Sequence, residues 1–367
     1  MKIVFCVPRY HTNMSAWVEV LLNNGHDVYV HAIVRGNTEN HTIVEPLIVR
    51  LSKVSTMIMR FFGSGGANKL RGFPEIFAYS KLLKDIDPDI IIVRGVNRWF
   101  SILVLFLSIF QSSKIIIYSQ TELYKKYSYA RNILTTSILN FFSATWITPL
   151  LGDCNKYNNY PDKMFYVPFL YLSPHLEPDL NSRSLRLLTV GKYTARKNHM
   201  MLLMAFNNLM CSGTLMYLTI CGEVSTAEHK KNFSELLYFV RENNLSKFVK
   251  LISNQPHSEM NKIYSQSNLF VLPASSEPAS YAIIEALAHG MPVICSSSCG
   301  TKWYVGDNCG LIFKDKSISE LESSIKRYTN SIFHNKSLLA VKKSNDLNGS
   351  GEDFYQKFLS ALPSRKC

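Results

Sequence analysis

The sequence predicts an α/β protein made of two domains, each a doubly wound parallel sheet, facing a central cleft. Two observations support this fold class. The chain has 367 residues, a length that suits two domains of ordinary size. Short apolar runs alternate with helical patterns through both halves, which is typical of parallel sheets covered by helices. Ligands of such sheets bind beside the carboxyl ends of the strands, so we expect the functional site there.

The first half, residues 1–170, opens with a β-loop-α-β pattern. Lys2–Val7 is a continuous apolar run, as expected for a strand that is covered on both faces. A polar loop over Pro8–Asn13 leads into a helix over Ser15–Asn24, and Gly25 stands where a helix C-cap is expected. The other elements predicted in this half are strands at Asp27–Val34, Asp89–Val93, Lys114–Tyr118, Ala144–Thr148 and Met164–Val167, and helices at Pro74–Lys84 and Trp99–Phe110.

Two of these helices carry a further expectation. Pro74 is expected at the start of its helix, where a missing N–H removes no hydrogen bond. Trp99–Phe110 is the most apolar run of the chain, but its 12 residues are fewer than the roughly 20 that a membrane span needs. We therefore expect Trp99–Phe110 to form a buried helix.

The second half repeats the alternation after a linker at residues 171–183. We assign residues 184–351 to the second domain and expect a final helix within 352–367 to pack back on the first. The predicted strands are Leu185–Val190, Leu215–Cys221, Lys247–Leu251, Leu269–Pro273 and Pro292–Ser296. The predicted helices are His199–Met210, Ala227–Asn243, His257–Ser265, Tyr281–His289, Ile318–Thr329 and Glu352–Leu362.

Composition limits the class of function. The formal net charge is +13, which attracts anions such as nucleotides and lipid headgroups. No nucleic-acid-binding motif accompanies this charge, so we expect no nucleic-acid partner. The eight cysteines lack disulfide or zinc spacing, and no signal peptide is visible. These features indicate a cytoplasmic protein.

Residues 50–84 combine basic and apolar side chains. The first 165 residues carry 18 Lys and Arg against 11 Asp and Glu, and several of the cations lie in this segment. One interpretation is a patch that holds the protein at the anionic inner face of the plasma membrane. The other is a solvated basic face over a loop that contains Gly63, Gly65 and Gly66. The side chains concerned are Arg50, Lys53, Arg60, Lys69, Arg71, Lys81 and Lys84, with Met57, Ile58, Met59, Phe61 and Phe62.

The most informative stretch lies between residues 272 and 294. A buried strand ends at Pro273, a loop of small residues follows, and a helix starts near Ser280. The N–H groups at a helix N-terminus bind phosphate. Glu277 lies in the loop and Glu285 in the helix, and carboxylates accept hydrogen bonds from sugar hydroxyls. This arrangement predicts a site for a phosphorylated sugar compound.

A purely structural interpretation of the two acids is also open. Glu277 would then be a helix-start acid favoured by the helix dipole, and Glu285 a solvated helix residue. Against this, the residues beside Glu285 are apolar, and a lone carboxylate on an apolar helix needs a partner. Its neighbours are Ile283, Ile284, Ala286 and Leu287.

The pattern Glu277-x7-Glu285, followed by Ala-Leu-Ala-His-Gly-Met-Pro, resembles the donor-site signature of the family 4 retaining glycosyltransferases. That family has the GT-B fold, two Rossmann-like domains facing a central cleft. The resemblance implies that Glu277 contacts hydroxyls of the donor sugar and that Glu285 holds the ribose of the nucleotide. The backbone amides implied to reach the sugar and diphosphate are those of Ala279, Ser280 and Tyr281.

A second match follows the strand at Leu185–Val190. Gly191, Lys192 and Lys197 resemble the family's Gly-Arg-x4-Lys loop, whose two cations bind the diphosphate. Lys192 takes the place of the Arg, Lys197 matches the Lys, and Arg196 is adjacent. The alternative is a basic turn without a ligand. Further along, Ile220-Cys-Gly222 and Gly310-Leu-Ile-Phe313 resemble the family's strand end near the nucleotide and its late strand.

The first half departs from the family pattern. The loop after the first strand lacks the family's usual glycines, and Gln120 stands where many members have a His. His11 and His31 are alternatives, although His31 fits a core histidine better. We therefore assign no catalytic residue in this half. The Asp85-x-Asp87-x-Asp89 pattern resembles a metal motif, but beside a proline it fits a helix-to-strand turn better.

The resemblance implies a retaining hexosyltransferase, with acceptor binding in the first domain and donor binding in the second. The donor would be a nucleotide sugar carrying a hexose or N-acetylhexosamine, with UDP favoured over GDP. The acceptor would be a glycan or lipid-linked molecule in surface polysaccharide assembly, such as lipopolysaccharide O-antigen or capsule. Glu277 and Lys197 are the catalytic candidates, and no metal or other cofactor is expected because cations and a helix dipole supply the charge. A nucleotide-sugar epimerase and a non-catalytic nucleotide-sugar-binding subunit remain alternatives.

Overall fold

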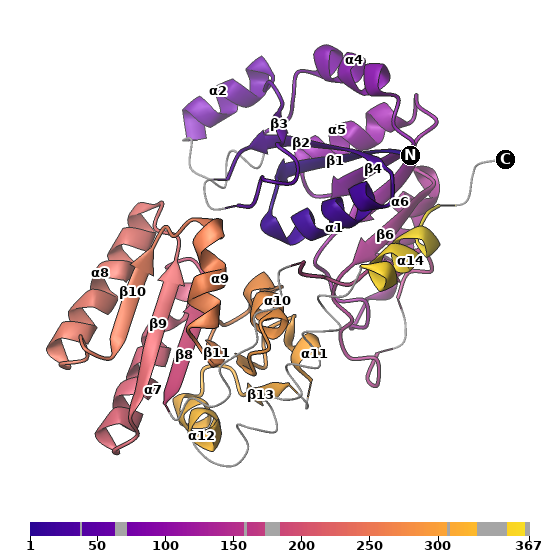
Figure 1. The fold of residues 1–367 in the computed structure, drawn as a ribbon. Helices are drawn as coiled ribbons and strands as arrows, with labels where there is room; N and C mark the ends of the chain where they lie inside the picture. The colour runs from indigo at the N-terminus through magenta and orange to yellow at the C-terminus, as the bar shows by residue number, and fades with distance from the viewer. Residues whose placement is uncertain are drawn as a thin grey trace. The chain divides into compact units, whose positions relative to one another are not determined.

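The protein folds into two compact units, each containing one parallel sheet (Figure 1). The computed structural model describes residues 1–36, 39–62, 72–157, 160–172, 184–306, 309–328 and 351–363. Unit 1 is formed by Met1–Leu170 with Ser350–Cys367, and unit 2 by Tyr171–Gly349. Most of the expected linker, residues 173–183, lies outside the described residues.

Unit 1 contains a sheet of seven strands in the order β3-β2-β1-β4-β5-β6-β7. All its strand pairs are parallel, and the central strands are buried along their length. This explains their unbroken apolar sequences. The strands are β1 (Lys2–Arg9), β2 (Asp27–Val34), β3 (Leu47–Ile48), β4 (Ile90–Arg94), β5 (Lys114–Tyr118), β6 (Ala144–Thr148) and β7 (Met164–Tyr166).

The helices of unit 1 are α1 (Thr12–Asn23), α2 (Lys53–Phe62), α4 (Ile76–Ile86), α5 (Trp99–Ser108), α6 (Tyr129–Phe141) and α14 (Glu352–Ser360). The last of these, α14, packs against α1 although more than 300 residues separate them in sequence. The rings of Trp17 and Phe354 stack with their centroids 5.3 Å apart. The Thr145 hydroxyl donates to the carbonyl of Ala361 at 2.6 Å. The end of the chain is therefore part of unit 1.

Unit 2 contains a sheet of six parallel strands in the order β10-β9-β8-β11-β12-β13. The strands are β8 (Leu185–Val190), β9 (Met216–Gly222), β10 (Val249–Ser253), β11 (Leu269–Leu272), β12 (Val293–Ser296) and β13 (Gly310–Phe313). The helical elements are η1 (Ala195–Lys197), α7 (His199–Cys211), α8 (Ala227–Glu242), α9 (His257–Ser265), α10 (Tyr281–Ala288), α11 (Lys302–Val305) and α12 (Ile318–Tyr328). The prediction of two doubly wound parallel α/β units is confirmed.

Several boundaries differ from the sequence prediction for local reasons. Strand β1 extends to Arg9 and α1 begins at Thr12, so the expected polar loop is shorter than predicted. The helix expected from Pro74 begins two residues later, because Glu75 is its N-cap and accepts from the N–H of Ala78 at 2.9 Å. Pro74 instead forms a bridge with the strand-like Leu51. Strand β3 and helices α2, α6 and α11 were not predicted.

The expectation of a fully buried helix at Trp99–Phe110 is wrong for its outer face. Helix α5 buries Phe100 and Val104 against the sheet, but Trp99, Phe106 and Phe110 are exposed. The run is apolar on all sides, so its sequence carries no signal that one side faces outward. In the described part of the chain, no helix combines the length and the apolar character needed to cross a membrane.

Two buried histidines make stability depend on pH. Burial lowers the pKa of His31 to about 4, and burial together with the charge of Lys197 lowers the pKa of His199 to about 4. Below pH 6.5 the unfolded chain binds protons that the folded chain does not. Stability should therefore fall as the pH drops from 6.5 towards 4, by about 2 kcal/mol per histidine at pH 5. Urea unfolding at pH 7.5 and 5 measures this loss. His31→Gln should reduce the loss, and an unchanged pH dependence would contradict the assignment.

Candidate functional site

The side chains singled out by sequence gather at the carboxyl ends of the strands in unit 2. The chain runs outward from β8 to β10 and then returns to β11 on the other side of β8. The loops after β8 and β11 therefore diverge at the point where a doubly wound sheet holds its ligand. The backbone joins these loops, because the N–H of Ser275 donates to the carbonyl of Arg196 at 2.9 Å.

Two glycines bring the ends of β8 and β9 unusually close together. A Cβ added to Gly222 would lie 2.0 Å from the carbonyl oxygen of Gly191, and one added to Gly191 would lie 2.9 Å from Cε of Lys197. Neither glycine has room for a side chain. The stem of Lys197 therefore lies directly over the backbone of Gly191, which helps to fix the position of its amine.

We expect Gly222→Ala to destabilise the protein by about 2–3 kcal/mol, because the new methyl group must displace the backbone of Gly191. Gly213→Ala is a suitable comparison, since Gly213 has a φ of +89° and a Cβ added there would meet no atom within 4 Å. Its cost is backbone strain alone, about 1–2 kcal/mol. Denaturant unfolding of both variants tests this difference, and equal losses would contradict the packing argument.

A buried ion cluster links the two loops. Nζ of Lys197 lies 2.8 Å from Oε2 of Glu277, and Nη1 of Arg196 contacts the same oxygen. Lys197 and Glu277 are 8% and 5% exposed, whereas Arg196 is partly open to solvent. Two cations thus share one carboxylate, which leaves a surplus of one positive charge. This surplus positive charge favours a bound anion, which could reach it at the partly exposed Arg196.

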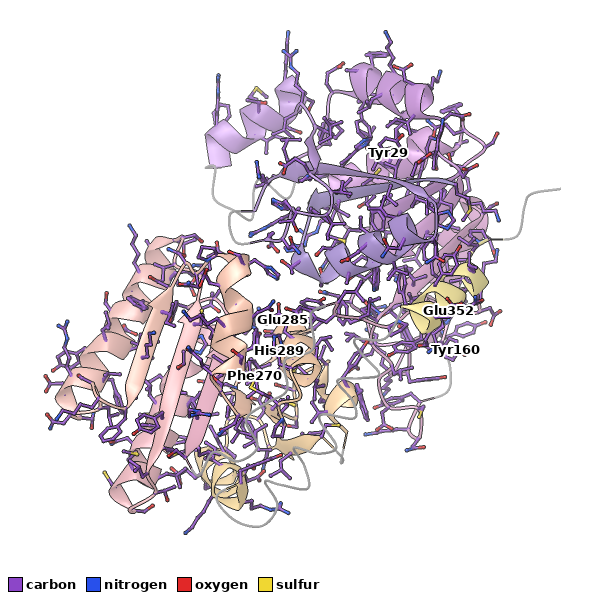
Figure 2. The ribbon with its side chains drawn as sticks, viewed as in Figure 1. Tyr29, Tyr160, Phe270, Glu285, His289 and Glu352 are labelled. Carbon is purple, nitrogen blue, oxygen red and sulfur yellow. The ribbon has the colours of Figure 1, made fainter. Side chains whose placement is uncertain are left out.

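Glu285 of α10 is buried among a second group of side chains, which includes two from α9; Figure 2 shows it close to His289 and Phe270. The hydroxyl of Tyr264 donates to its Oε2 at 2.8 Å, and Nε2 of His257 lies 4.0 Å from its Oε1. Burial, and next the charge of Glu285, raise the pKa of Tyr264 well above its ordinary value and that of Cys221 to about 11. The carboxylate is therefore close enough to Cys221 of β9 to influence its thiol electrostatically. Its exposed fraction of 8% excludes the solvated interpretation.

His289 contacts both Glu285 and Tyr264. Its Nδ1 lies 2.7 Å from the carbonyl oxygen of Glu285, and its ring stacks on that of Tyr264 at 4.8 Å between centroids. Tyr264 in turn stacks near Phe270 of β11. Glu285 is thus held at both ends, by its own backbone through His289 and by its carboxylate through Tyr264.

The start of α10 lies between the two acids. Ser280 is its N-cap residue, and the Ser280 N–H donates to the hydroxyl oxygen of Thr301 at 3.2 Å. Thr301 is fully buried and also contacts the thiol of Cys299 at 3.2 Å. The expected anion contact of Ser280 would therefore have to replace this bond. Ala279 and Tyr281 flank Ser280, with Tyr281 half-buried against the ring of Tyr171.

Lys192 is set apart from the ion cluster. Its amine lies 2.8 Å from Oε2 of Glu223, and its side chain is 46% exposed. The structure thus brings Arg196 and Lys197 onto Glu277 but directs Lys192 to another partner. Sequence reasoning missed Tyr264, Thr301 and Glu223. No motif identified them, although Tyr264 lies in the last turn of α9, shortly before the apolar strand β11 that ends at the site.

The first unit contains its own polar cluster, after β1. Glu39 accepts from the N–H of Thr12 at 2.8 Å and contacts Arg9 and His11 at 2.9 and 3.2 Å. Burial raises the pKa of Glu39, but the bonds from His11, Arg9 and Thr12 together lower it below its ordinary value. A protein carboxylate therefore occupies the start of α1.

The structure also shows the surroundings of the other candidate residues in unit 1. Gln120 accepts from Arg94 at 3.1 Å, and the Arg94 guanidinium lies over the ring of Tyr118. His31 is buried with its Nδ1 3.0 Å from the hydroxyl of Tyr79, as expected for a core histidine. Asp87 is the left-handed C-cap of α4, which confirms the turn at the Asp-x-Asp pattern. Among the described residues, no three His, Cys, Asp or Glu side chains are grouped as metal ligands.

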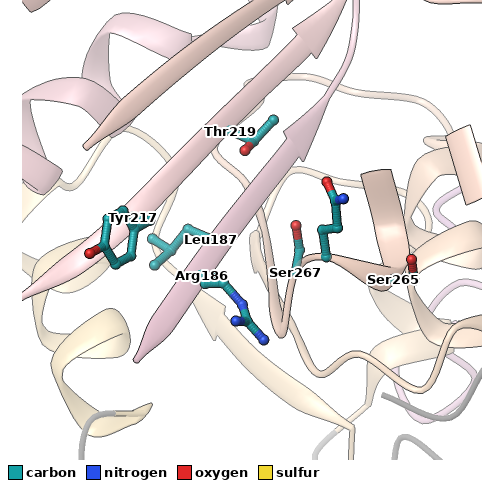
Figure 3. A pocket seen from close by; sticks show the side chains of 7 residues that line it. Arg186, Leu187, Tyr217, Thr219, Ser265 and Ser267 are labelled. Carbon is teal, nitrogen blue, oxygen red and sulfur yellow. The ribbon is translucent and has the colours of Figure 1, made fainter. Parts of the chain in front are cut away.

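A pocket of about 490 Å³ lies away from these residues (Figure 3). Its walls include Arg186 of β8 and Tyr217 of β9, near the amino ends of the two strands. Gly191 and Gly222 are at the opposite ends of the same strands. Since ligands of doubly wound sheets bind at the carboxyl ends, we do not assign this pocket to the candidate site.

Comparison with known families identifies unit 2. Residues 177–338 match the family described as "Glycosyl transferases group 1". The chain contains a group 1 glycosyltransferase domain. The expected enzyme class is thereby confirmed, and the matched residues include both acids and the Gly191–Lys197 loop. The family 4 assignment is compatible with this match.

One sequence relative matches a short part of the chain. A stretch of 73 residues, 20% of this chain and 19% of the relative, is 37% identical to TuaC of Bacillus subtilis (strain 168). This relative is named "Putative teichuronic acid biosynthesis glycosyltransferase TuaC". The match thus spans about a fifth of the relative.

Solved structures match the whole chain. Anabaena Alr3699/HepE, in complex with UDP-glucose, has a TM-score of 0.72 at 12% identity and covers 98% of this chain and 99% of its own. The sucrose-phosphate synthase from Thermosynechococcus elongatus has a TM-score of 0.69 at 16% identity, with 98% of each chain covered. At such identities the likeness establishes the fold, and it confirms the expected GT-B class.

Proposed function

We propose that the protein is a retaining glycosyltransferase that takes a hexose or N-acetylhexosamine from a UDP-sugar. The observation that carries the proposal is the ion cluster of Arg196, Lys197 and Glu277 at the ends of β8 and β11. A nucleoside diphosphate brings negative charge to two cations that share a single carboxylate. The shared carboxylate, that of Glu277, can itself accept hydrogen bonds from sugar hydroxyls.

The two acids would divide the donor between them. Glu277, beside the cations, would accept hydrogen bonds from hydroxyls of the donor sugar close to the diphosphate. Glu285, beside the end of β9, would accept hydrogen bonds from the ribose hydroxyls, as the resemblance implies. A preference for UDP is supported by the fold relative Alr3699/HepE, whose structure contains UDP-glucose. Both acids are buried, so their bonds to a donor would form away from competing water.

The reaction would break the bond between C1 of the sugar and the diphosphate oxygen and form one from C1 to the acceptor oxygen. The hydroxyl proton of the acceptor would pass to the departing phosphate. Negative charge grows on that phosphate as its bond to C1 breaks, and Lys197 and Arg196 would stabilise it. Because attack and departure would occur on the same face of the sugar, the anomeric configuration would be retained.

The proposed acceptor is a glycan or lipid-linked molecule of surface polysaccharide assembly, used at the inner face of the plasma membrane. Two relatives support this setting through their names: TuaC, and the lipopolysaccharide outer core galactosyltransferase WaaB, a fold relative. In the sequence-predicted membrane segment, Met57 and Phe61 of α2 are exposed, near the exposed Arg60. Gly63, Gly65, Gly66, Lys69 and Arg71 lie outside the described residues, as do the side chains of Met59 and Phe62.

The test is a thermal-shift screen of UDP, GDP and ADP sugars, followed by NMR of the transfer product. We expect the largest stabilisation with a UDP-sugar and a product with the donor's anomeric configuration. Incubation with the donor alone separates the alternatives. Epimerisation of the sugar would indicate an epimerase, and UDP binding without transfer or hydrolysis would indicate a binding subunit. An inverted product would exclude the retaining mechanism.

A further inference from the structure

Helix α6 of unit 1 has four large apolar or aromatic side chains exposed on its outer side: Tyr129, Ile133, Leu134 and Phe141. Of its 13 residues, Leu139 is the one that is buried. The side chains of Asn132, Thr135 and Thr136 are half-buried, whereas the apolar Ile133 and Leu134 are 50% and 62% exposed. A helix on the surface of a soluble domain normally has the reverse arrangement. The outer side of α6 is therefore suited to a non-aqueous environment.

Helix α5 continues this apolar surface. It packs on the same side of the sheet as α6, since Phe100, Val104 and Leu139 belong to one core cluster (Figure 1). The ring of Phe106 in α5 meets that of Phe142 at 5.9 Å, just after α6. We call the combined surface the α5–α6 face and define it by its exposed residues Trp99, Phe106, Phe110, Tyr129, Ile133, Leu134 and Phe141.

Positive charge borders the α5–α6 face at the start of α6. Nζ of Lys125 and the guanidinium of Arg131 lie 5.2 and 5.5 Å from the centre of the Tyr127 ring. Burial, and next the charge of Arg131, lower the pKa of Lys125, while the charge of Glu122 raises it. Over residues 98–141 five residues are basic and one is acidic, namely Arg98, Lys114, Lys125, Lys126 and Arg131 against Glu122. The charge complements an anion.

We propose that the α5–α6 face binds the surface of an anionic lipid bilayer. Its apolar side chains would enter the interfacial region, and Lys125 and Arg131 would contact lipid phosphates near the positive end of the α6 dipole. A second copy of the chain is a poorer partner, because it would add a second set of cations to the same interface. The proposal deepens the membrane setting of the proposed function and rests on it for its biological purpose.

The experiment measures flotation of the full chain with vesicles of phosphatidylcholine, with and without phosphatidylglycerol. We expect binding to require the anionic lipid. Ile133→Ser/Leu134→Ser should weaken binding at least 10-fold, because two exposed apolar side chains no longer enter the bilayer. Lys125→Gln/Arg131→Gln should weaken it about 30-fold, since each cation contributes about 1 kcal/mol.

A matched control is Leu215→Ser/Tyr217→Ser, which removes two exposed apolar side chains from unit 2; it should bind vesicles as the wild type does. Wild-type binding by Ile133→Ser/Leu134→Ser would overturn the proposal. So would a wild type that binds no vesicles but forms a dimer that this variant abolishes. Measuring UDP-sugar binding on the same samples separates the two proposals. A protein that binds vesicles but no UDP-sugar would contradict the proposed reaction and would still support the proposed membrane surface.

Discussion

Lys197→Ala should lower turnover with the best nucleotide-sugar donor by about 100-fold or more. The amine of Lys197 lies 2.8 Å from Glu277 and is largely buried, so its loss removes the better placed of the two cations. Losing one preorganised group that faces developing negative charge typically has an effect of this size. Steady-state kinetics under saturating donor and acceptor measure it.

Comparison variants make the result specific. Arg196→Ala should have a smaller effect, because its partly exposed guanidinium acts against competing water. Lys231→Ala removes an exposed cation that is paired with Glu235 on α8, and it should leave turnover unchanged. Thermal unfolding of each variant shows whether the fold is kept. A folded Lys197→Ala protein with wild-type turnover would remove the proposed role of the ion cluster.

Glu285→Ala should weaken binding of UDP itself by about 10–100-fold, the effect of losing hydrogen bonds to a charged group. Because Glu285 is the proposed ribose contact, the loss should appear without any sugar on the nucleotide. Calorimetric titration with UDP measures it. Glu277→Ala is the informative contrast, since it should reduce turnover with the UDP-sugar much more than it reduces affinity for UDP.

Tyr264→Phe tests how Glu285 is held. The variant keeps the ring stacked on His289 but removes the 2.8 Å bond to the carboxylate. We expect a loss of UDP affinity smaller than that of Glu285→Ala, together with a loss of stability of about 1–3 kcal/mol because the buried carboxylate loses a hydrogen-bond donor. Equal affinities of wild type and Glu285→Ala for UDP would show that the nucleotide does not bind at this carboxylate.

The repetitive parts of the fold could be predicted from the sequence. Buried parallel strands such as β1 contain unbroken apolar runs, here Ile3–Val7, and Gly25 follows the end of its helix as expected. Helix α6 escaped prediction because its apolar residues lie on both its outer side, as Ile133 and Leu134 do, and its inner side, as Ile138 and Leu139 do, so its pattern directed towards the core is weak. Strand β3 has two residues, too few to form a pattern.

The site residues likewise fall into some that the sequence predicted and others that it did not. Glu277 and Glu285 were identifiable because one loop and one helix fix their spacing, and Lys197 because it follows Gly191 at a characteristic spacing in the loop after β8. Their partners come from other elements: Tyr264 from α9 and Thr301 from the turn after β12. Contacts of this kind depend on how strands are ordered in the sheet. The pairing of Lys192 with Glu223 likewise depends on β8 lying next to β9.

The cysteines offer a practical consequence. Among the described residues Cys154 and Cys211 are exposed, while Cys6, Cys221, Cys295, Cys299 and Cys309 are buried. Cys154 belongs to unit 1 and Cys211 to unit 2. In a Cys367→Ser background, which removes the cysteine beyond the described residues, maleimide dyes would attach at one point on each unit. Energy transfer between the two dyes would then report whether their separation changes when nucleotide is added.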